Sequence, residues 1–211
     1  QLAFGGPSAV AADQAFPTLI YPLAYPTYGE ELLREPALRV THGTGSPSVR
    51  LLVDGHSEQL HPHGRLHRIE LVDRVAPLLV TLCWRTWPAY GLIEQWVEVT
   101  NTGAAPSTLH QASSASPALA GDDPWFTHWG GGWAQEWTET TEPVTPGTKT
   151  VASAGGVRSS LHRPPVALFA GSGRATETEG SVLAATVIWG GDTRFDAEMG
   201  ADIARVITND L

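Results

Sequence analysis

Apolar and polar residues alternate with a period of two along much of this chain. Within residues 77–87, one side of an extended backbone would carry Leu78, Val80, Leu82 and Trp84. Residues 93–100 repeat the pattern, with valines opposite glutamates. Such alternation is typical of half-buried β-strands. The intervening PAYG at 88–91 then predicts a hairpin connection.

Similar short runs continue along the sequence, separated by turn signals such as GDDP at 121–124, TPG at 145–147 and GSG at 171–173. They predict further strands at 49–53, 66–72, 107–113, 125–129, 133–138, 149–152, 166–169 and 182–189. Only residues 197–207 read as helical, and Gly200 weakens that interpretation. Regularly spaced short strands indicate an all-β sandwich or barrel.

The densest aromatic stretch is WFTHWGGGWAQEW at 125–137, which contains four tryptophans around three glycines. If two strands flank the glycines, Trp125 and Trp129 share one face of the first, and Trp133 and Trp137 share one face of the second. Core packing of these rings is the first interpretation. Stacking on sugar rings is the alternative.

Residues 27–39 are the least strand-like part of the chain, and prolines punctuate this region. We expect an ordered loop here. Ordered long loops are disproportionately functional.

Composition narrows the range of partners. The chain has 211 residues and a net charge of −9, which suits one large all-β domain over residues 1–211. The acidic balance argues against nucleic acid, and no stretch approaches the ~20 apolar residues that cross a bilayer. The single cysteine, Cys83, excludes an internal disulfide and gives a lean towards the cytoplasm. A chain that begins with Gln is expected to be cut from something longer.

Candidate chemistry within the chain is weak. Imidazoles at His61, His63 and His67 lack a diagnostic spacing of further ligands, and turn-forming Pro and Gly separate them, so no metal is expected. Asp122 and Asp123 lie in a turn and would face opposite ways on a strand. There is no G-x-S-x-G elbow, no phosphate-binding loop and no dinucleotide fingerprint, so neither catalysis nor a cofactor is predicted.

Four blocks nevertheless resemble glycoside hydrolase family 36, the α-galactosidases. YPLAYPTYG at 21–29 followed by LREPAL at 33–38 is similar to that family's "YP-x-EYP-x-YG…D-F-R-x-P-A". FTHWGGGWAQEW resembles "LTHF-x-G-x-WAREF", GGVRSSLHRPPVAL at 155–168 resembles "G-x-SSH-x-x-NPF-x-AL", and VIWGG at 187–191 resembles "VYSGNF". Their order along the chain is the family's order.

The resemblance implies the family's N-terminal domain, a large antiparallel β-sandwich of the supersandwich type that precedes a catalytic (β/α)₈ barrel. It therefore implies that this chain alone is inactive, that it packs against the barrel of its own chain, and that it assists homo-oligomer assembly. In many members the loop after the YG pair reaches the galactoside pocket of a neighbouring subunit. The matching substrate-contact candidates here are Tyr28, Glu30, Glu31 and Arg34. Leu32 stands where the family carries aspartate, which favours a related α-linked hexoside as well as galactosides.

Two other functions remain open at this stage. One is a free-standing carbohydrate-binding module that stacks sugars on Trp125, Trp129, Trp133 or Trp137. The other is a sugar epimerase, but the sequence pairs no His with a Glu at a convincing position.

Overall fold

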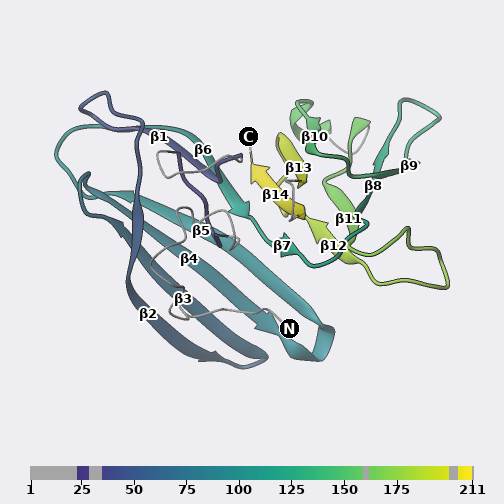
Figure 1. Ribbon diagram of the computed structural model, residues 1–211, viewed down its shortest axis with the longest axis horizontal. Helices are drawn as coiled ribbons and strands as arrows, with labels where there is room; N and C mark the ends of the chain where they lie inside the picture. Colours follow the sequence, from purple (N-terminus) through teal and green to yellow (C-terminus); the bar gives the residue numbers. More distant parts are fainter. Residues whose placement is uncertain (1–22, 29–34, 159–161, 200–203, 211) are drawn as a thin grey trace, which may run out of the picture.

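The computed structural model describes residues 23–28, 35–158, 162–199 and the backbone of 204–210. Within this part of the chain, fourteen strands form one six-stranded and two four-stranded sheets (Figure 1). Every pairing between named strands is antiparallel. The predicted all-β class with an antiparallel sandwich architecture is confirmed.

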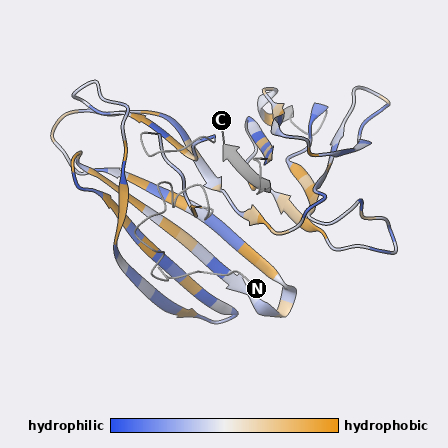
Figure 2. Ribbon diagram, in the orientation of Figure 1, coloured by the Kyte–Doolittle hydropathy of each residue, from blue (hydrophilic) through white to orange (hydrophobic). Residues whose placement is uncertain are grey.

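The first four-stranded sheet follows the chain as a meander. Its strands are β2 (Leu51–His61), β3 (Gly64–Asp73), β4 (Leu78–Trp87) and β5 (Leu92–Asn101). Pro62 and His63 form a two-residue turn, because His61 pairs with Gly64. The PAYG connection is a 3-10 turn, Pro88–Tyr90, which Gly91 closes in the left-handed region at φ 62°. The alternation of apolar and polar positions along these strands is visible in Figure 2.

The six-stranded sheet lies between the other two in Figure 1 and draws its strands from both ends of the chain. Its order is β1-β6-β14-β13-β10, and β7 pairs with β14 beside this path. The strands are β1 (Leu38–Thr41), β6 (Thr108–Ala115), β7 (Ala118–Leu119), β10 (Gly147–Ser153), β13 (Thr193–Met199) and β14 (Ala204–Asp210).

The second four-stranded sheet has the order β12-β11-β8-β9. Its strands are β8 (Trp125–Gly130), β9 (Thr138–Pro143), β11 (Val166–Ala170) and β12 (Leu183–Thr186). The start of β11 lies beside the ends of both its neighbours. Ala167 is opposite His128 near the end of β8, and Val166 is opposite Thr186 at the end of β12. One end of this sheet therefore gathers the connections 131–137, 162–165 and 187–192.

Two separate clusters of buried side chains fill the space between sheets. The first joins residues of β1 and its flanks to the β2–β5 sheet, and includes Leu38, Val40, Val80 and Leu82. The second joins β10 and β13 to the second four-stranded sheet, and includes Val151, Phe195, Phe126 and Phe169. The rings of Phe126 and Phe169 stack at 4.8 Å. The central six-stranded sheet thus contributes side chains to both cores and links the two outer sheets.

The helical interpretation of residues 197–207 is wrong. Strand β13 runs to Met199 and strand β14 begins at Ala204, and the two pair with each other from Thr193↔Asp210 to Met199↔Ala204. Ala197 and Glu198 favour helices in isolation, but pairing with the neighbouring strands overrides this weak local propensity. Ala197 enters the second core while Glu198 faces the opposite side of the sheet.

The three histidines of the β2–β3 hairpin do not converge on a common point. His61 and His63 pack their rings on Trp87, at 4.9 and 5.8 Å, whereas His67 lies on the strand beyond, 3.5 Å from Glu58. Among the described residues, no group of three or more His, Cys, Asp or Glu side chains is placed to hold a metal ion. No described helix is long and apolar enough to span a membrane.

Candidate functional site

The structure describes only part of the predicted sugar-contact loop. Tyr28 is 54% exposed, while Glu30, Glu31 and Arg34 lie outside the described residues. What the structure describes in detail is the support on both sides of residues 29–34. Tyr28 and Glu35 are the last and first described positions around that segment.

The N-terminal side of the segment is tied to two neighbouring stretches. The hydroxyl of Thr27, which is fully buried, donates to the carbonyl of Val49 at 2.7 Å, and the Val49 N–H donates to the carbonyl of Tyr28 at 2.8 Å. Thr27 also forms a parallel bridge with Leu38, and the Ala37 N–H donates to the carbonyl of Pro26. These bonds hold residues 26–28 between two neighbouring stretches, while Tyr28 remains partly exposed.

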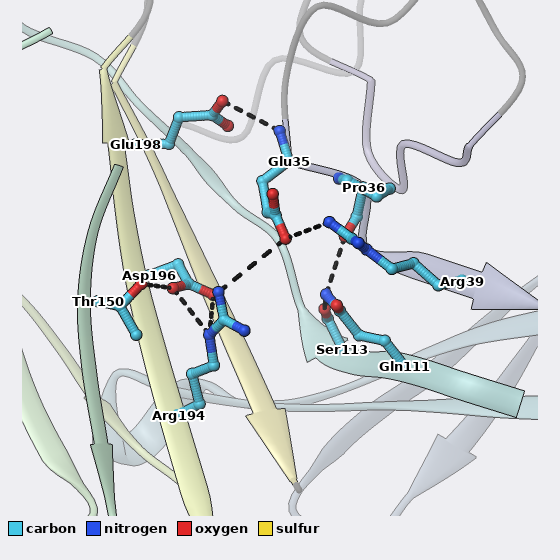
Figure 3. A network of polar contacts seen from close by, with 9 residues as sticks. All are labelled: Glu35, Pro36, Arg39, Gln111, Ser113, Thr150, Arg194, Asp196 and Glu198. Carbon is cyan, nitrogen blue, oxygen red and sulfur yellow. Dashed lines mark hydrogen bonds and ion pairs between the residues drawn. The ribbon is translucent and has the colours of Figure 1, made fainter. Parts of the chain in front are cut away.

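The other side of the segment is tied by charged groups (Figure 3). A carboxylate oxygen of Glu35 accepts from Arg39 at 2.7 Å and lies 4.0 Å from a nitrogen of Arg194. Arg194 in turn lies 2.9 Å from the carboxylate of Asp196, which is fully buried and also accepts from the Thr150 hydroxyl at 2.5 Å. A buried carboxylate requires such partners, because desolvating an unpaired charge is costly.

Two further bonds complete this anchoring network. The backbone N–H of Glu35 donates to Glu198 at 3.0 Å, and the side-chain amide of Gln111 donates to the carbonyl of Pro36 at 2.9 Å. Figure 3 shows β1, β6 and β13 all contributing to it. Sequence reasoning missed these residues. The available signal was Arg194, Asp196 and Glu198 at every second position, which places three charges on one face of one strand.

The four tryptophans of 125–137 divide into two groups. Trp125 and Trp129 lie half-buried on one face of β8, as predicted, while Phe126 and His128 on the other face are buried. Trp133 and Trp137 are 89% and 54% exposed. Core packing is therefore wrong for this second pair, and Trp125 and Trp129 lie on the face of β8 opposite the one that enters the second core. The Trp137 ring lies 6.1 Å from that of Trp129, inclined at 53°.

The predicted strand at 133–138 is also wrong. Gly130 remains in β8, opposite Thr138, and residues 131–137 form an irregular connection before β9 begins. Ala134 and Trp137 both have positive φ, at 62° and 59°, which is uncommon for residues other than glycine. Strain of this kind persists only where surroundings over-determine the backbone, and it concentrates at functional sites.

Exposed apolar side chains recur in the connections at this end of the sheet. Val157, Ile188 and Trp189 are 89%, 87% and 56% exposed, in addition to Trp133 and Trp137. The Gly156 N–H donates to Asp192 at 2.6 Å, which ties the connection holding Val157 to the one holding Trp189. We call these five residues the aromatic end surface: Trp133, Trp137, Val157, Ile188 and Trp189. They lie on connections that share one end of the sheet, and exposed apolar groups gathered on one side of a protein are candidates for an interaction surface.

A His–Glu pair that the sequence did not reveal lies on β8 and β9. Nε2 of His128, a buried side chain, is 2.9 Å from Glu142, and Lys149 of β10 approaches the same carboxylate at 3.0 Å. The hydrogen bond with His128 holds the pKa of Glu142 below its ordinary value, and Lys149 adds to this shift. The sequence does not reveal this pair, because the two residues lie on different strands separated by the irregular connection 131–137.

Known proteins resemble the whole of this arrangement. The family model for the glycosyl hydrolase family 36 N-terminal domain matches residues 3–208. Alpha-galactosidase 2 of Hypocrea jecorina is 23% identical over 94% of this chain and 30% of its own length. The alpha-galactosidase of Lactobacillus brevis superposes with a TM-score of 0.84 at 20% identity, over 99% of this chain and 30% of that one.

A Geobacillus stearothermophilus family 36 alpha-galactosidase, solved in complex with stachyose, superposes with a TM-score of 0.79 at 24% identity, over 87% of this chain and 28% of its own. The chain spans between 18% and 30% of the length of the curated relatives it matches. Since the family model covers nearly every residue, this chain belongs to the glycosyl hydrolase family 36 N-terminal domain family.

Proposed function

We propose that this chain is the supporting, non-catalytic domain of an α-galactosidase-type retaining glycoside hydrolase. Its sandwich would hold residues 27–35 and the aromatic end surface against the catalytic part of the enzyme, of the same or a neighbouring subunit. The substrate would be an α-galactoside or a related α-linked hexoside, in keeping with the names of its relatives.

The observation that carries this proposal is the aromatic end surface. Trp133 at 89% exposure, Val157 at 89% and Ile188 at 87% present large apolar areas to solvent in connections that hydrogen bonds hold in shape. A β-sandwich with two well-filled cores has no need of these side chains for its own stability. Their exposure is explained if another folded unit covers them.

The anchoring network supports the second part of the proposal. A loop that shapes a pocket must be held to within a fraction of an ångström, and misplacement by about 1 Å can cost about a hundredfold in rate. Glu35 receives one ion pair, donates one backbone bond and lies near a second guanidinium. These contacts fix the residue that directly follows the segment, which is the kind of rigid support that a functional site requires.

The test uses the full-length protein that carries this chain. Trp133→Ser and Trp189→Ser are expected to lower kcat/KM towards nitrophenyl α-galactoside by about tenfold, as misplaced site elements do, and to shift the oligomer distribution measured by light scattering. The matched control is Val75→Ser, because Val75 is 95% exposed in the β3–β4 turn. Wild-type activity and assembly in both tryptophan variants would contradict the proposal.

A carbohydrate-binding module is the second candidate, and the pair of Trp129 and Trp137 favours it. Their indoles lie 6.1 Å apart, inclined at 53°, and Trp137 is 54% exposed, so its ring is accessible to a sugar. This function predicts that the chain alone binds raffinose, and that Trp137→Ala abolishes the binding. Binding by calorimetry that survives this substitution would exclude this pair as the stacking site.

A further inference from the structure

The inner face of the β2–β5 sheet is covered by the first core along only part of its length. Leu71, Val80 and Leu82 are buried there. The next row across the sheet, towards the hairpin turns, is Glu58, His67, Trp84 and Gln95, since these residues pair in register. Beyond it lies the row of Arg65, Thr86 and Ile93, and Ile93 is 51% exposed.

A hollow of about 580 Å³ opens on these rows. This volume falls within the range of about 300–1,000 Å³ that small-molecule sites occupy. The residues that line it come from all four strands: His56, Ser57, Glu58, His67, Arg68, Ile69, Trp84, Thr86 and Ile93. The hollow lies on a different sheet from the aromatic end surface.

The chemistry of the hollow combines one flat apolar wall with polar groups of both kinds. Trp84, which packs against the first core from the edge, supplies an indole beside Ile69 and Ile93. Glu58 supplies an accepting carboxylate that is 43% exposed, and the Thr86 hydroxyl and the imidazoles of His56 and His67 can donate or accept.

The charges in and around the hollow nearly cancel. The carboxylate of Glu58 pairs with Arg65 and lies 3.5 Å from Nδ1 of His67. Glu58 is neutralised in this way and can accept a hydrogen bond without attracting a free cation. The remaining cation of the lining, Arg68, lies in register with Cys83 on the opposite face of the sheet, so its charge is not directed into the hollow. An uncharged ligand with several hydroxyls on a flat apolar framework fits these groups best.

We propose that this hollow binds a neutral saccharide of one to three rings. The apolar face of a pyranose lies on Trp84, one hydroxyl donates to Glu58, and others bond to His67 and Thr86. Aromatic stacking supplies contact area, and the polar groups fix the orientation of the ligand, as is usual in small-molecule sites. The proposal is independent of the aromatic end surface.

The test uses the full-length protein labelled with 5-fluorotryptophan, in which the resonance of Trp84 is assigned from Trp84→Phe. The probe is a thio-linked methyl α-galactoside, which glycosidases do not cleave. Saturable movement of the Trp84 resonance at millimolar probe is expected. Glu58→Gln is expected to weaken the apparent Kd at this resonance by about tenfold, the equivalent of about 1.4 kcal/mol.

The matched control is Glu94→Gln on the outer face of the same sheet. Glu94 also pairs with an arginine, Arg85, at 3.0 Å, so it reproduces the loss of an ion pair without touching the hollow. An unchanged Kd in this variant supports the proposal. A Trp84 resonance that stays fixed at tens of millimolar probe overturns it, as does one shielded from a soluble paramagnetic quencher, because protein would then fill the hollow. Movement of other tryptophan resonances alone reports binding elsewhere and also counts against it.

Discussion

Glu198 accepts a hydrogen bond of 3.0 Å from the backbone N–H of Glu35, although 163 positions separate the two residues. The bond joins the segment that enters β1 to the polar face of β13. On the same face, Arg194 and Asp196 continue the contact, and Thr150 of β10 extends it to the sheet edge. The segment that enters β1 is therefore joined to β13 at the residue that directly follows residues 29–34.

We expect Arg194→Leu to destabilise the protein by about 3 kcal/mol, because it strips the ion-pair partner from a fully buried Asp196. Urea unfolding curves measure the change. Arg39→Leu provides the comparison, since the Arg39 side chain is 45% exposed and its pair with Glu35 is worth less than about 1 kcal/mol. The double variant Arg194→Leu with Asp196→Leu should recover much of the loss. Equal losses for the two single variants would contradict the assignment of Asp196 as the buried charge.

We expect Glu142 to make the free energy of unfolding depend on pH in the acid range. Its pKa is held below the ordinary value of 4.5, chiefly by the hydrogen bond with His128. A lowered carboxyl pKa stabilises the fold at pH values above 4.5, and this contribution disappears as the pH falls through the folded-state value. Glu142→Gln should therefore flatten the acid limb of the stability curve.

The corresponding measurement is the free energy of unfolding from neutral pH down through the acid limb. Glu139→Gln serves as the control, because Glu139 lies on the same strand and is exposed. It accepts from Thr141, not from His128. An acid limb of wild-type slope in Glu142→Gln would show that the His128 bond contributes nothing to the linkage.

Cys83 is expected to resist alkylation in the folded protein. Its side chain is fully buried, and burial, followed by the charge of Glu98, raises the pKa of the thiol. The thiolate is the nucleophile, so both effects slow its reaction with iodoacetamide. Mass spectrometry should find no modification of native protein under conditions that label the urea-unfolded chain fully. Rapid labelling of the native protein would mean that β4 opens locally.

Gly171→Ala should cost about 2–3 kcal/mol through overpacking. A Cβ there would clash with the carbonyl oxygen of Ala120, a backbone atom that cannot rotate out of the way. The two segments cross closely, since the Asp123 N–H donates to the carbonyl of Gly171 at 3.2 Å. Gly132→Ala is the control, because a Cβ at that position meets nothing within 4 Å. Thermal unfolding should separate the variants, and similar midpoints would refute the close crossing.

Several elements followed directly from the pattern of residues. Strands β4 and β5 lie within one residue of the predicted 77–87 and 93–100, because a sheet with one buried face imposes strict alternation. The connection 131–137 did not follow. Its tryptophans alternate as if on a strand, yet positive φ at Ala134 and Trp137 turns the chain into solvent. Apolar composition alone does not distinguish a side chain buried in the core from one exposed on the surface.

The candidate sites divide in the same way. Trp125 and Trp129 were correctly placed on one face, and the family was recognisable from four short blocks that share an order. The pairs Glu35–Glu198 and His128–Glu142 were not predictable, because no local period links residues on different strands. Likewise, the predicted turns at 121–124 and 171–173 were each apparent, but not their contact through Asp123 and Ser172.

By itself, the sequence determined that the chain is all-β, where most strands lie and which family it resembles, since alternation and turn chemistry are local properties. Only the tertiary structure decided that one central sheet serves two cores, that charges on β13 anchor residue 35, and that Trp133 and Trp189 face solvent. The physical reason is that burial and charge pairing depend on strand order, and strand order is set by the free energy of the whole fold rather than by any segment.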